Sequence, residues 1–211
     1  MAAATTTSVT QRQWFIASRW QEYDGESRAN LLRIIAIGAF YIVQLIQFYV
    51  IAKASADELP FHQKATAIAV AWTMLALAVM LCLRSRIFPT ALTYCSTLGD
   101  LLLLTAIAAL AAGPHSPLVL AYFVIIALAA LRFSLPLVWF STLGAMIGYW
   151  SLVGIADKKW FDPHHAVPPA EQLITLLSLA MTGIVAGQVV RRVKGLAEEY
   201  AQRLVAAKAK I

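Results

Sequence analysis

Six long apolar runs constrain the fold of this chain more than any other feature. They cover residues 32–52, 65–83, 88–112, 117–131, 135–156 and 170–190. About 20 apolar residues in a helix match the hydrocarbon core of a bilayer, and open strands cannot satisfy their backbone groups in lipid. We therefore predict an all-α polytopic membrane protein built as a six-transmembrane-helix bundle.

The composition excludes an ordinary soluble domain. Of 211 residues, 60% are hydrophobic and 13% are charged, whereas soluble domains average about 45–50% and about 25%. Six spans leave no room for a sizeable catalytic domain, and the sequence contains no phosphate loop, paired carboxylates or nucleophile beside a base. We expect no enzymatic activity and no cofactor. Cys82 and Cys95 lie in apolar runs and are expected to be free thiols.

The distribution of Lys and Arg predicts the orientation, because cytoplasmic loops retain positive charge. With the N-terminus inside, 13 of the 17 Lys and Arg residues are cytoplasmic, Arg33 and Arg132 among them. The other four are Lys53, Lys64, Lys158 and Lys159. Both termini are predicted to be inside, in a multi-pass protein of a bacterial inner (plasma) membrane. The net charge of +6 then needs no nucleic-acid partner.

The chain divides into three segments. Residues 1–31 lack a signal peptide and alternate aromatic with charged side chains, which predicts a cytoplasmic helix at the lipid headgroups; a solvated helix or frayed tail is the alternative. Residues 32–190 form the transmembrane domain, and residues 191–211 form a cytoplasmic helix. The fourth span is short, and we expect a break near Arg132 rather than continuation to a kink at Pro136.

Asp100 is the only acidic residue within a predicted span, about 13 residues from its start. A carboxylate at that depth must be paired, hydrated or protonated. Gln44 and Thr73 lie at similar depth and are the predicted donors. The group is either a proton- or ligand-responsive switch or a structural contact between helices.

The histidines His62, His115, His164 and His165 all fall on the predicted outer side. Convergence of three loops would create a pH or metal sensor. Their spacing matches no known zinc motif, so solvated loop histidines are the alternative and no metal is assigned. Haem is disfavoured because no histidine lies within a span.

Two pairs of glycines are spaced by four residues, Gly144 with Gly148 and Gly183 with Gly187. This spacing allows close helix contact, either between two copies or within one chain.

The last predicted segment carries a heptad pattern. Apolar positions follow one another at steps of three and four, which predicts a parallel coiled coil; a single helix lying on the headgroups is the alternative. The seam consists of Val190, Val193, Ala197, Tyr200, Leu204, Ala207 and Ile211.

Asp100, the turn Gly113-Pro114-His115-Ser116-Pro117, and the apolar span containing Tyr122-Phe123 resemble the six-helix membrane input region of bacterial sensor histidine kinases and class III nucleotide cyclases. The resemblance covers about residues 30–210 by layout. It implies a last span that continues into a signalling coiled coil. No kinase or cyclase domain follows in this sequence, so it implies an anchor and sensor module without enzymatic activity.

We therefore expect a homodimeric membrane anchor and sensory input module that passes a signal to a cytoplasmic helix and its effector. Two alternatives remain open. One is an accessory subunit of a larger respiratory or photosynthetic membrane complex, and the other is a small transporter.

Overall fold

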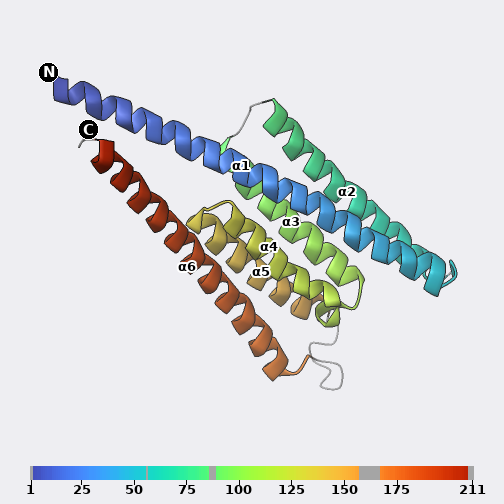
Figure 1. Cartoon of the computed structure of the whole chain (residues 1–211). Coiled ribbons are helices and arrows are strands. Elements are labelled where there is room, and N and C mark those ends of the chain that lie inside the picture. Colours follow the sequence, from blue (N-terminus) through green and yellow to red (C-terminus); the bar gives the residue numbers. More distant parts are fainter. Residues whose placement is uncertain (1, 56, 86–88, 157–166, 209–211) are drawn as a thin grey trace.

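The regular structure in the described part of the chain is entirely helical (Figure 1). The computed structural model describes residues 2–55, 57–85, 89–156 and 167–208, except for the side chains of 2–22, 90, 155–156, 201 and 204–208. The long helices are α1 (Ala2–Ile46), α2 (Leu59–Arg84), α3 (Thr90–Leu110), α5 (Leu135–Ala156) and α6 (Pro169–Lys208). The shorter elements are a π-helix, η1 (Gln47–Ile51), two 3-10 helices, η2 (Gly113–His115) and η3 (Pro117–Leu120), and α4 (Ala121–Leu131). The predicted all-α membrane fold is confirmed at this level.

Five described helices are long and apolar enough to cross a bilayer. The fourth apolar segment, Pro117–Leu131, is shorter than the others. Six spans were predicted, the fourth of them short; the described part of the chain has five helices of spanning length and this shorter apolar segment. Most of the predicted boundaries agree with the helices within a few residues, although α2 begins six residues earlier than expected.

The short α4 packs against α1, α3, α5 and α6. Six of its 11 residues are buried, which explains how a segment shorter than a bilayer can be accommodated. It ends at Leu131, and α5 begins at Leu135 after a turn with Phe133 at φ 50°. The predicted break near Arg132 is therefore confirmed. Pro136 lies in the first turn of α5, where its missing N–H costs nothing, and produces no kink.

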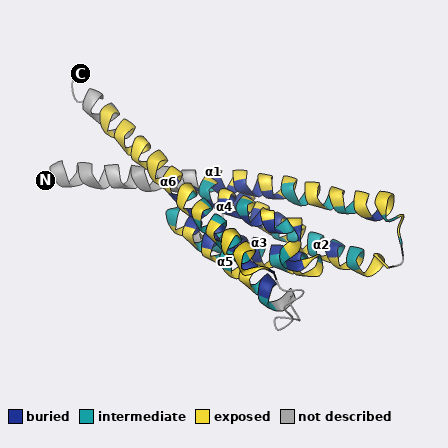
Figure 2. Cartoon of the chain, turned by 90° about the horizontal axis from the view of Figure 1, so that it is seen from below, coloured by how far each residue is buried: buried dark blue, intermediate teal, exposed yellow. Residues whose placement is uncertain are grey.

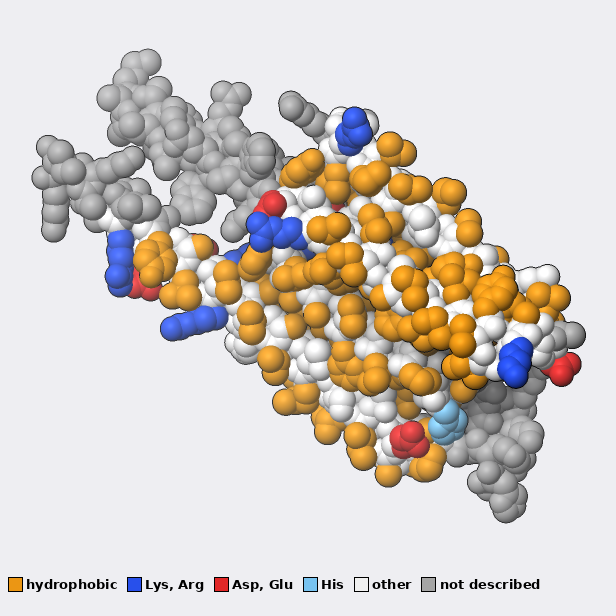
Figure 3. Space-filling model, turned by 45° about the vertical axis from the view of Figure 1, so that its right-hand side comes forward, with side chains coloured by type: hydrophobic (Ala, Val, Ile, Leu, Met, Phe, Trp, Pro, Cys, Tyr) orange, Lys and Arg blue, Asp and Glu red, His pale blue; other side chains and the backbone are white. Residues whose placement is uncertain are grey.

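The outer faces of the long helices are apolar. Large side chains such as Val43 on α1, Met74 on α2, Ile147 on α5 and Leu177 on α6 are more than half exposed. Figure 2 shows exposed residues along the outside of the bundle, and Figure 3 shows hydrophobic side chains covering the visible face between its two ends. Such an apolar surface is a liability in water and normal in lipid.

The expected segment boundaries do not coincide with helix ends. α1 is continuous from Ala2 through residue 31, and α6 is continuous through residue 190. The N-terminal part of α1 and the C-terminal part of α6 extend from the same end of the bundle (Figure 1). Each extension is therefore joined to the bundle by continuous helical backbone, so a movement of one can be passed to the other.

Candidate intramembrane polar site

Asp100 lies in the middle of α3, ten residues after Thr90 and ten before Leu110. This is about 15 Å from either end of the helix. Its carboxylate accepts from Arg33 of α1 through two nitrogens: Nη2 donates to Oδ2 at 2.8 Å, and Nε donates to Oδ1 at 2.8 Å. The two side chains are 4% and 2% exposed. Two parallel hydrogen bonds of this kind fix the relative orientation of the two side chains and also strengthen their attraction.

Two further side chains complete the hydrogen bonding of this pair. Trp72 of α2 donates from Nε1 to Asp100 Oδ1 at 2.8 Å. Asn30 accepts from Arg33 Nη1 at 2.6 Å and donates to the carbonyl oxygen of Ala76 at 3.1 Å. The pair therefore connects α1, α2 and α3 through polar contacts.

A second buried ion pair lies closer to the end of the bundle from which both chain extensions leave. Arg132, the residue that directly follows α4, contacts Glu26 of α1, with Nε 2.8 Å from Oε2 and Nη2 donating to Oε1 at 3.0 Å. The two side chains are 3% and 0% exposed. Arg132 also donates to the hydroxyl of Thr97, and Ser96 donates to Glu26 Oε1 at 3.3 Å. This pair joins α1 to α4, with hydroxyl partners from α3.

The two pairs form one polar cluster because of helical spacing. Glu26, Asn30 and Arg33 are separated by four and three residues and lie on one face of α1. The cluster consists of Glu26, Asn30, Arg33, Trp72, Ser96, Thr97, Asp100 and Arg132. Its two acids and two arginines balance each other. A buried pair gains little net stability over apolar residues but is costly to break, so the cluster specifies which helix faces meet.

The sequence-based prediction for Asp100 was wrong about its partners. Thr73 donates to the carbonyl oxygen of Ala69 at 2.8 Å, and Asp100 is held by Arg33 and Trp72. Gln44 lies 11 residues beyond Arg33 on α1, about 16 Å farther along the helix. It is therefore too distant to replace that contact.

Arg33 and Arg132 were counted as cytoplasmic, and Glu26 was placed in the interfacial segment. The structure buries all three inside the bundle. The recurrence of polar residues at 26, 30 and 33 was the available signal. It was missed because the first apolar run was taken to begin at 32, which left Glu26 and Asn30 outside the span and Arg33 at its edge.

The four histidines are not brought together as a described site. His62 is in the first turn of α2 and stacks on Phe48 with ring centroids 4.1 Å apart, whereas His115 is in η2. His164 and His165 lie outside the described residues. Among the described side chains, no group of three or more His, Cys, Asp or Glu could hold a metal ion.

The four glycines lie at contacts within the chain. A Cβ added at Gly144 would meet Leu101 of α3, and one at Gly148 would meet Tyr122 of α4. At Gly183 and Gly187 it would meet Thr142 and Leu135 of α5. These contacts account for both small-residue pairs without a second copy of the chain.

Gly183→Ala is expected to lower the free energy of unfolding by about 1–3 kcal/mol, the range for an overpacked contact. The added methyl group would meet Thr142, which is buried and donates to Val138. Equilibrium unfolding in bicelles measures this change. Gly38→Ala is the control, since nothing lies within 4 Å of its added Cβ. Equal losses in the two variants would contradict the close contact.

Comparison of the chain with protein-family models, curated proteins and solved structures found no match.

Proposed function

We propose that this protein is a non-enzymatic membrane input module that couples the packing of its helical bundle to a helix outside the membrane. The observation that carries the proposal is α6, a single helix of 40 residues. Its Val190 is buried against α4 and α5, whereas the next seam residues, Val193, Ala197 and Tyr200, are exposed. A shift or rotation of α6 within the bundle would therefore be transmitted directly to an exposed apolar stripe.

The polar cluster supplies a discrete element for such a module. α1 is joined to α3 by one buried ion pair and to α4 by another, and α4 in turn packs against α6. A signalling transition requires different contacts in two states rather than continuous deformation. Exchange or loss of one pair would change how α1 and α4 sit beside α6.

The proposed orientation has six crossings, with α4 as the short fourth crossing and both termini in the cytoplasm. The shared end from which α1 and α6 extend supports an even number of crossings (Figure 1). With Arg33 and Arg132 removed from the connector count, 11 Lys and Arg residues remain on the proposed inner side and four on the outer. A bacterial inner membrane is the proposed location.

The proposed output is a homodimer through the α6 seam. A lone amphipathic helix buries its apolar stripe by pairing with another, and a parallel partner of the same sequence presents the same stripe. A cytoplasmic effector would recognise this paired helix.

Cysteine cross-linking tests the seam in a background where Cys82 and Cys95 are replaced by alanine. Tyr200→Cys and Val193→Cys are expected to give a covalent dimer in native membranes upon oxidation, because seam positions approach across a coiled coil. Gln202→Cys is the matched control, since it is exposed on the opposite face of the same helix. We expect at least fivefold less dimer from it.

Equal cross-linking on both faces, or none at the seam, would overturn the homodimer. Purification of the unmodified chain then separates the remaining alternatives. Stoichiometric recovery with large membrane subunits would indicate the accessory role, and solute-driven flux in proteoliposomes would indicate transport.

A further inference from the structure

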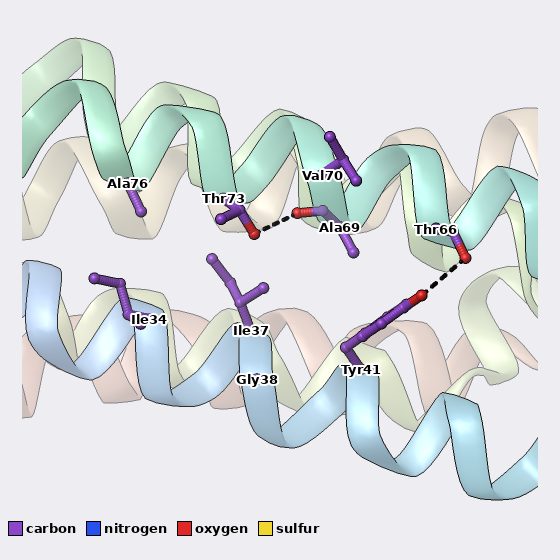
Figure 4. Close-up of a pocket in the computed structure, with 9 residues that line it drawn as sticks. All are labelled: Ile34, Ile37, Gly38, Tyr41, Thr66, Ala69, Val70, Thr73 and Ala76. Atoms are coloured by element: carbon purple, nitrogen blue, oxygen red, sulfur yellow. Dashed lines mark hydrogen bonds between the residues drawn. The ribbon is translucent and has the colours of Figure 1, made fainter.

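A groove between α1 and α2 is not used by the polar cluster or by the α6 seam. It has a volume of about 270 Å³ (Figure 4). The side chains that decide its character are Ile34, Ile37, Gly38 and Tyr41 of α1 and Ala69 and Thr73 of α2. It lies within segments of both helices that are long and apolar enough to cross a bilayer, where hydrocarbon would surround it.

The hydroxyl groups of the groove are already occupied. Tyr41 shares a hydrogen bond with Thr66 at 3.2 Å, which joins the two helices at one end of the groove. Thr73 donates to the carbonyl oxygen of Ala69 at 2.8 Å. The groove therefore offers an apolar surface without free donors, which favours an apolar occupant over a polar one.

The protein does not fill the space beside Gly38. A Cβ at this position would meet no atom within 4 Å, and the residue is exposed. In the close-up, Ile34 and Ile37 extend from α1 toward α2, and Gly38 follows Ile37 on α1 (Figure 4). Surfaces bordering such a space lose dispersion contacts unless another molecule supplies them.

The size of the groove discriminates between occupants. Its α1 wall runs from Ile34 to Tyr41, which is about 10 Å at 1.5 Å per residue. A helix with side chains is about 10–12 Å wide, so the groove could not enclose one over that length. A single aliphatic chain is much thinner and fits the volume observed.

We propose that this groove binds one acyl chain of a membrane phospholipid, which enters sideways from the bilayer. The chain would pack on the helical turns that carry the first ion pair. Ile34 directly follows Arg33, Thr73 directly follows Trp72, and the carbonyl oxygen of Ala76 at the groove accepts from Asn30. Lipid occupancy would therefore support the α1–α2 contact beside the polar cluster.

The test uses the full chain in detergent, titrated with palmitoyl-oleoyl-phosphatidylglycerol and followed by native mass spectrometry. The wild type is expected to retain one lipid more tightly than all others. Gly38→Leu should weaken that binding event at least tenfold, because the leucine side chain would occupy the groove. It should fold normally, since the added side chain starts in open space; the thermal transition verifies this.

Ala78→Leu is the matched control, because Ala78 is exposed on α2 and does not line the groove. It should retain the tight lipid. Unchanged binding by Gly38→Leu, or an equal loss in Ala78→Leu, would overturn the proposal.

A second arm identifies the recognised part of the lipid. A phospholipid with a photoactivatable group in mid-chain should label the wall residues Ile37 and Thr73 saturably. Excess phosphatidylcholine and excess phosphatidylglycerol should compete equally, because the groove contacts the chain. Competition by the anionic lipid alone would indicate a headgroup site and contradict the proposal. Neither result of this lipid test changes the cross-linking expected for Tyr200→Cys. The lipid groove and the proposed homodimer can therefore fail independently.

Discussion

Replacing Asp100 with leucine is expected to lower the free energy of unfolding by about 3–5 kcal/mol, the range for removing one partner of a buried ion pair. The variant leaves Arg33, whose side chain is 2% exposed, without its bidentate acceptor. It also removes the acceptor of Trp72. Reversible unfolding in bicelles measures the loss, and a change below about 1 kcal/mol would contradict the paired geometry.

The double variant Arg33→Leu with Asp100→Leu separates charge from packing. Most of the lost stability should return, because no unpaired charge remains buried. A double-mutant cycle then gives the coupling between the two side chains. If the double variant is as unstable as the sum of both single variants, the pair is not the unit that holds α1 to α3.

Arg132→Leu is the second substitution with a large expected effect, again about 3–5 kcal/mol. It leaves the fully buried Glu26 without its cation and removes a donor to Thr97. Equilibrium unfolding under the same conditions measures it. The expected loss is large because the side chain of Glu26 is 0% exposed and would keep an unpaired charge inside the bundle.

Arg28→Leu is the matched control for that substitution. Arg28 pairs with Asp24 on the same helix, but the two side chains are 73% and 57% exposed. Exposed pairs contribute about 0–1 kcal/mol, so this variant should remain close to the wild type. Similar losses from Arg28→Leu and Arg132→Leu would show that burial of the second pair does not determine stability.

The helical fold could be predicted from the sequence because apolar runs and bilayer thickness leave few alternatives. The boundaries of α5 and the end of α4 followed from the same argument, since a charged residue such as Arg132 interrupts an apolar run. The location of α4 against four other helices could not be predicted. Its apolar residues look the same whether they face lipid or protein.

The polar cluster was only partly predictable. The burial of a lone acid at Asp100 requires a partner, and this was recognised. The partner was missed because Arg33 lies at the edge of an apolar run. A charged side chain there costs little free energy and is usually exposed. Only the packing of α1 against α2 and α4 shows that this edge is inside the protein, and such packing is not encoded in hydropathy.

The short α4 has a consequence for membrane insertion during synthesis. A segment of 15 residues that is followed directly by an arginine is a poor substrate for the translocon when presented alone, since it is shorter than the roughly 20 apolar residues that match a bilayer. Glu26 and Thr97 precede it in the chain and are available when Arg132 emerges. The earlier helices α1 and α3 would thus assist the insertion of α4 by supplying partners for Arg132.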